Sequence, residues 1–95
     1  MEHLYIVVYD IADPKRWRKV FKLMKGYGEW VQLSVFQCRL SRRRQADLVA
    51  RLDGMIDHAE DHVVLVDIGV ADGVEPRFVS LGKKFRAVRR EPVIV

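Results

Sequence analysis

Side chains that can bind phosphate gather in three basic groups along this 95-residue sequence. Lys and Arg total 17 against 13 Asp and Glu, which gives a formal net charge of +4. The first group repeats at helical spacing over positions 15–25, the second occupies positions 42–44, and the third alternates with apolar residues over positions 83–90. No acid is interleaved with the first group to pair with it, which favours a nucleic-acid surface. A solvated outer helix face is the equally weighted alternative.

The second basic group breaks a local rule. Arg42, Arg43 and Arg44 follow Ser41, a residue type that caps helices, and so lie in the first turn of an expected helix. Cations at this positive end of the helix dipole each cost about 0.3–1 kcal/mol. A bound phosphate would reverse that penalty and use the free amides of the same turn. Arginines that bend away into water are at least as good an explanation.

Acids and histidines give weaker signals. Asp10 directly follows an apolar run, and an aspartate in that place commonly bonds nearby backbone amides in a turn. Positions 58–62 contain two histidines and two acids without a recognisable metal-ligand spacing, so we interpret them as a solvated loop. The single cysteine, Cys38, allows no internal disulfide and is interpreted as a small core residue.

The elements that must position these side chains begin with positions 4–9, six apolar or aromatic residues that predict an interior strand covered on both faces. Asp13 and Pro14 then supply the cap and first position of a helix that extends to about Lys25. Glycine at positions 26 and 28 is expected to end this helix through the left-handed conformation. Its predicted core face is Trp17, Val20, Phe21, Met24 and Tyr27.

The second half of the chain continues with extended residues 29–40, which form either one bent strand or two short ones. A helix follows Ser41, and positions 63–70 predict another strand, with Asp67 near a sheet edge. A turn at positions 72–73 leads to residues 78–95, an extension expected to contact a dimer mate or partner, whose apolar end could add a short strand. The apolar stripe of the second helix is Leu48, Val49, Leu52, Met55 and Ile56.

Length and composition indicate one domain over residues 1–95 with a modest core. No apolar run approaches the ~18 residues of a membrane span, and the amino terminus lacks a signal-peptide pattern, so we expect a cytoplasmic protein without membrane contact. The order of elements is that of an α+β, ferredoxin-like βαββαβ sandwich with a short extra C-terminal strand. Many activities use this fold, so it does not identify function.

Motifs in the first 40 residues are more specific. Tyr-Asp-Ile-Ala-Asp at positions 9–13, the Lys-Arg pair at 15–16, Gly-Tyr-Gly at 26–28 and Val-Gln-Leu-Ser-Val-Phe-Gln-Cys at 31–38 together resemble the CRISPR-associated protein 2 family. The sequence departs from the family pattern at two positions. Trp30 stands where an arginine is common, and Gln37 stands where a glutamate is common.

The resemblance implies a homodimer that works with the CRISPR-associated integrase, protein 1, in spacer acquisition, and a metal-dependent endonuclease acting on RNA or DNA. It implies that Asp10 binds Mg²⁺, that Ser34 helps to place a phosphate or water, and that Phe36 packs beside it, which makes these three the catalytic candidates. A two-fold dimer would have to bring two copies of Asp10 together. The implied contacts to the nucleic-acid backbone on the first helix are Lys15, Arg16, Arg18 and Lys19.

An architectural function is the alternative. In this hypothesis the basic faces, including Arg42, Arg43 and Arg44, hold duplex DNA in the integrase complex, and the chain cuts nothing. A sequence-specific RNA-binding module is the weakest hypothesis, because residues 31–40 lack the aromatic pattern that such a module needs on its central strand.

Overall fold

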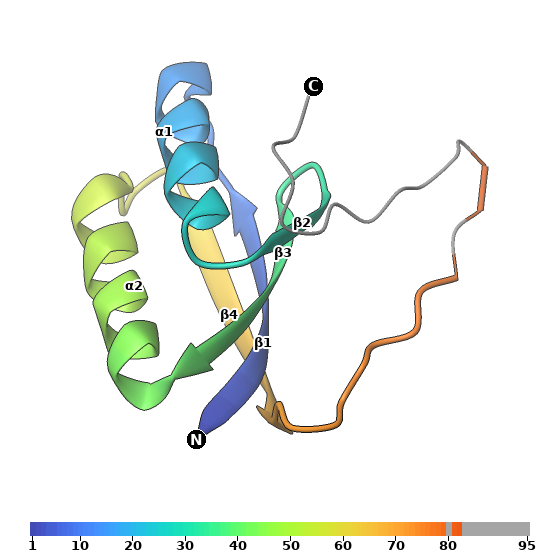
Figure 1. The fold of residues 1–95 in the computed structure, drawn as a ribbon. Coiled ribbons are helices and arrows are strands. Elements are labelled where there is room, and N and C mark those ends of the chain that lie inside the picture. The colour runs from blue at the N-terminus through green and yellow to red at the C-terminus, as the bar shows by residue number, and fades with distance from the viewer. Residues whose placement is uncertain (80, 83–95) are drawn as a thin grey trace.

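The computed structural model describes residues 1–79 and 81–82, and they form an α+β fold (Figure 1). The elements are β1 (Glu2–Asp10), α1 (Pro14–Lys25), β2 (Glu29–Gln32), β3 (Val35–Ser41), α2 (Arg42–Met55) and β4 (His62–Val70). The four strands make one antiparallel sheet in the order β2-β3-β1-β4, and both helices lie on the same side of it. This confirms the predicted ferredoxin-like sandwich. The extra C-terminal strand lies outside the described residues.

Strand β1 is interior to the sheet, as predicted, but the prediction that both of its faces are covered is wrong. Val7 and Tyr9 are buried under the helices, whereas Val8, which points the other way, is 41% exposed. The cross-strand partner of Val8 on β4 is Val64, and Ile6 is paired with Val66. These side chains lie on the side of the sheet that neither α1 nor α2 covers, which we call the open face.

Helix α1 follows the sequence prediction closely. The Asp13 side chain accepts a hydrogen bond from the backbone N–H of Arg16 at 2.8 Å, and Pro14 occupies the first helical position. Val20 and Met24 are fully buried, which confirms the predicted core face.

The glycines after α1 have a different role from the predicted one. Gly26 is right-handed, with φ of −81°, so this helix does not end through a left-handed residue. At Gly28, an added Cβ would collide with the carbonyl oxygen of Gln37 and the sulfur of Cys38. Glycine is therefore needed at position 28 because the segment that follows α1 passes very close to β3. Cys38 itself is buried, and burial raises the pKa of its thiol to about 12, which confirms its core role.

Residues 29–40 form two strands rather than one. The hairpin turn between β2 and β3 contains Leu33, whose φ of +35° is in the left-handed region although the residue is not glycine. The indole N–H of Trp30 donates to the Leu33 carbonyl at 3.1 Å and holds the turn. Because no glycine or asparagine marks this turn, the sequence pattern does not distinguish one bent strand from two short strands.

Helix α2 begins as predicted, since the Ser41 side chain accepts from the backbone N–H of Arg44 at 3.2 Å. Leu48 and Leu52, on the face of α2 that packs on the sheet, are buried. Val49, which we predicted on the same core face, is 40% exposed. The apolar stripe of α2 is therefore narrower than its spacing suggested.

Strand β4 is the edge strand next to β1, which confirms the prediction for Asp67. The predicted turn at Asp72 and Gly73 is present, and Gly73 has a φ of +72°. Arg39 fixes the chain around this turn by donating to the carbonyls of Ala71 at 2.8 Å and Val74 at 2.6 Å. Within residues 1–79 and 81–82, no helix is long and apolar enough to span a membrane.

Candidate functional site

Asp10 is the last residue of β1 and is exposed. It has the same parity along the strand as Val8, so its carboxylate belongs to the open face. Its cross-strand partner is His62, the first residue of β4. In the described part of the chain, the Asp10 side chain makes no hydrogen bond or ion pair. The expected bonds to nearby turn amides are therefore not formed, and the carboxylate is available for a ligand.

Ser34 lies close to the end of β1 through its backbone. The Ser34 carbonyl accepts a hydrogen bond from the Tyr9 amide at 3.1 Å, next to Asp10. Its hydroxyl accepts from the indole N–H of Trp17 on α1 at 2.8 Å. The hydroxyl is thus engaged on the helical side, while its own proton is still free to be donated.

Phe36 is fully buried, with no exposed side-chain surface. Its ring lies 6.3 Å from that of Tyr9 and 5.6 Å from that of Phe21, both measured between ring centroids. Phe36 pairs with Val7 on the helix-covered face, whereas Asp10 belongs to the open face. The fold brings the backbones of the three catalytic candidates to one end of the sheet, but it places the side chains of Asp10 and Phe36 on opposite faces.

Asp61 is a residue whose role sequence reasoning missed. We predicted a solvated loop here, but the Asp61 side chain has no solvent exposure. One carboxylate oxygen accepts from the Ala12 amide at 2.9 Å, and the other accepts from the Asp57 amide at 2.8 Å. The Arg16 guanidinium donates to both oxygens, at 2.7 and 3.1 Å. This bidentate pair and the two amides hold the pKa of Asp61 well below its usual range.

The Asp61 network ties together the two segments that carry the candidate site. Ala12 comes two residues after Asp10, and Asp61 directly precedes His62. The weak signal for this network was an aspartate immediately before a strand. Its arginine partner is 45 positions away, which no local pattern reveals.

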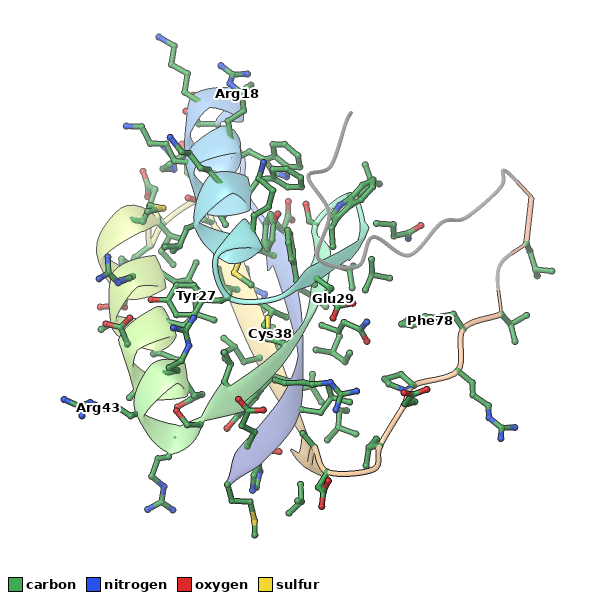
Figure 2. The ribbon with its side chains drawn as sticks, viewed as in Figure 1. Arg18, Tyr27, Glu29, Cys38, Arg43 and Phe78 are labelled. Atoms are coloured by element: carbon green, nitrogen blue, oxygen red, sulfur yellow. The ribbon has the colours of Figure 1, made fainter. Side chains whose placement is uncertain are left out.

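The basic residues of α1 divide into two kinds. Arg16 is already engaged by Asp61, with Glu60 at 3.5 Å as a further acidic neighbour, so its charge stabilises the fold. Lys15, Arg18 and Lys19 are exposed. Figure 2 shows Arg18 extending away from α1. Nucleic-acid binding by the first helix stays a prediction, and it depends on these exposed cations.

The arginines of α2 are also divided. Arg44 donates to the Gly26 carbonyl at 3.1 Å, and its guanidinium lies 4.6 Å from the centroid of the Tyr27 ring. It therefore joins the start of α2 to the end of α1, which is a structural reason for one cation in this turn. Arg42 and Arg43 are exposed. Arg43 and Arg18 lie near opposite ends of the helical layer in Figure 2.

The residues around Asp10 fit a weakly held hydrated cation. Among the described residues of one chain, no group of three or more His, Cys, Asp or Glu side chains could hold a metal ion. Magnesium usually keeps several waters and takes one or two carboxylates. The Asp10 carboxylate, exposed and without a partner among residues 1–79 and 81–82, meets that requirement in part, and in the proposal below a second carboxylate comes from another protomer.

Comparison with known proteins extends the resemblance beyond the first 40 residues. The family model described as CRISPR associated protein Cas2 matches residues 2–72. A relative from Rhodospirillum rubrum, named CRISPR-associated endoribonuclease Cas2 1, is 54% identical over 94 residues, covering 99% of this chain and 92% of the relative. A CRISPR-associated endoribonuclease Cas2 from Geobacter sulfurreducens is 53% identical over 95 residues, covering 100% of both chains. The crystal structure of a hypothetical protein from Thermus thermophilus is similar with a TM-score of 0.72 and 38% identity, covering 90% of this chain and 100% of that one.

Proposed function

This chain belongs to the CRISPR-associated protein Cas2 family, and we propose that it is a metal-dependent endonuclease that hydrolyses phosphodiester bonds in RNA or DNA. It works as a homodimer in CRISPR spacer acquisition. The names of its relatives from Rhodospirillum rubrum and Geobacter sulfurreducens support nuclease activity. The observation that carries the proposal is the position of Asp10 at the rim of an apolar sheet face, where its carboxylate has no partner within the described part of the chain.

The open face supports the homodimer. Val8, Val64, Val66 and Ile68 are between 39% and 51% exposed, and a contiguous apolar surface on a folded domain commonly marks an interface. A two-fold contact uses the same surface on both protomers. Because Asp10 belongs to this face, such a contact brings both Asp10 carboxylates to one interface. Dimerisation is then a condition for metal binding.

In this proposal the Asp10 carboxylates of the two protomers hold Mg²⁺. When bound, the cation would neutralise charge on the phosphate and make water more acidic. Lys15, Arg18 and Lys19 bind the nucleic-acid backbone, and they follow Asp10 closely in the chain at the start of α1. The proton of the Ser34 hydroxyl is available to a phosphate oxygen, while the hydroxyl oxygen accepts the hydrogen bond from the Trp17 indole N–H.

Cleavage assays with Asp10→Asn test the nuclease directly. Labelled RNA and DNA are incubated with the parent and the variant in Mg²⁺ and in EDTA. We expect cutting only by the parent in Mg²⁺, because asparagine keeps the shape of the side chain and removes its charge. Asp72→Asn is the matched control, since Asp72 is an exposed aspartate in the turn after β4, at the other end of the sheet. Equal residual cutting in all samples would refute the metal nuclease.

A second candidate function is a non-catalytic DNA-binding scaffold in complex with the integrase, protein 1. The exposed cations Arg42 and Arg43 favour it, because a nuclease centred on Asp10 has no evident use for them. They follow Ser41, which pairs with Glu2 at the start of β1, whereas Asp10 is the last residue of that strand. Duplex binding is measured over a salt series with Arg42→Ala and Arg43→Ala combined. The scaffold predicts weaker binding to every sequence and a smaller salt slope. A salt slope equal to that of the parent would show that Arg42 and Arg43 do not contact the DNA backbone.

A further inference from the structure

His62 is the cross-strand partner of Asp10, a neighbour that the order of residues in the sequence does not reveal. Directly opposed residues in an antiparallel pair place their side chains on the same face, with Cβ atoms about 4.5–5.5 Å apart. Both residues are exposed. A carboxylate and an imidazole therefore stand side by side at the rim of the open face.

His62 also differs from the other two histidines in the chain. His3 bonds to the Asp67 carboxylate at 3.0 Å, and His58 bonds to the backbone carbonyl of Asp53 at 2.9 Å. The His62 ring has no hydrogen bond or ion pair within the described residues. Its nitrogen lone pair is thus available to a ligand, like the carboxylate beside it.

The backbone on both sides of this pair is anchored to one buried group. Asp61, immediately before His62, accepts a hydrogen bond from the amide of Ala12, two residues after Asp10. The Arg16 guanidinium holds the same carboxylate in a bidentate pair. Ligands on rigid, anchored backbone lose little conformational freedom when they bind a cation.

We propose that His62 is a second ligand to the cation that Asp10 binds, so that each protomer contributes one carboxylate and one imidazole. This inference rests on the metal binding in the proposed function and makes its metal class more specific. Magnesium prefers oxygen ligands, whereas imidazole suits transition metals. The site therefore takes divalent transition ions that accept both donor types, such as Mn²⁺ or Ni²⁺, more tightly than Mg²⁺.

Electron paramagnetic resonance of Mn²⁺ tests the proposal without an activity assay. Free Mn²⁺ is counted in titrations of full-length protein without a histidine tag, and spin-echo modulation reports whether nitrogen is bound to the ion. We expect a nitrogen signal in the parent that His62→Ala removes, with at least about tenfold weaker Mn²⁺ binding. The affinity for Mg²⁺, measured by its competition with Mn²⁺, should fall less in His62→Ala than the affinity for Mn²⁺ does. His58→Ala is the matched control and should keep both the signal and the affinity.

Two results separate this inference from the proposed function. Mn²⁺ bound by the parent without a nitrogen signal, and with unchanged affinity in His62→Ala, would overturn the histidine ligand while Asp10 remained a metal ligand. Mn²⁺ affinity that Asp10→Asn leaves unchanged would overturn the metal site itself. Circular dichroism of each variant shows that it is folded before its affinity is compared.

Discussion

Replacing Phe36 by alanine tests whether this residue serves the active site directly or through the core. Its side chain is 0% exposed and its ring contacts those of Tyr9 and Phe21. Truncating a buried phenylalanine costs about 3–5 kcal/mol, a large part of the roughly 5–15 kcal/mol that stabilises a domain. With a urea slope of about 1.5 kcal/mol per M, the unfolding midpoint should fall by about 2–3 M.

The assay is urea unfolding at one fixed protomer concentration, because any dimer makes stability depend on concentration. Phe36→Leu should lose less than Phe36→Ala, since leucine refills part of the space. Leu33→Ala is the control, because Leu33 is 73% exposed on the hairpin turn and its truncation should cost less than about 0.5 kcal/mol. Nucleic-acid cleavage should fall in proportion to the unfolded fraction. A Phe36→Ala protein that unfolds within about 1 kcal/mol of the parent yet cuts nothing would refute the packing role.

Three further substitutions probe the contacts that position the site. Gly28→Ala should destabilise by about 1–3 kcal/mol in urea unfolding, because the new Cβ meets Cys38, and an unchanged midpoint would contradict this close approach. Asp61→Asn should be less stable than the parent near neutral pH. Because the folded-state pKa of Asp61 is depressed, its contribution is full above about pH 4 and is lost as the pH falls further, so the difference between parent and variant should narrow there. A difference that stays constant into acid would refute the charged network. Arg44→Ala should cost about 1 kcal/mol in unfolding, because it removes the contacts to Gly26 and Tyr27. Arg43→Ala should raise stability by up to about 1 kcal/mol, since it removes a cation from the positive end of the helix dipole, and should weaken nucleic-acid binding; the reverse pattern would contradict the division between them.

Local signals in the sequence accounted for much of the fold. The cap at Asp13 and the proline after it gave the start of α1, and apolar spacing gave its buried face. The order of strands and helices predicted the ferredoxin-like sandwich, and the motif around Asp10 predicted the family. These features depend on neighbours a few positions apart, so periodicity and capping chemistry are enough to read them.

Contacts between distant segments were beyond the sequence pattern. Asp61 lies in a stretch that resembles a solvated loop, and only the fold brings Arg16 and Ala12 to its carboxylate. Arg44 is likewise explained only by the fold, because its guanidinium donates to the Gly26 carbonyl at the end of α1, 18 positions earlier in the chain.

The sequence by itself determined that Asp10 ends a strand, and it linked that residue to a nuclease family. The tertiary structure decided which face carries the carboxylate and that His62 is its neighbour. The physical reason is strand register. A shift of one residue between β1 and β4 would send the side chains of one strand to the other face of the sheet, and that register is set by the packing of the whole core.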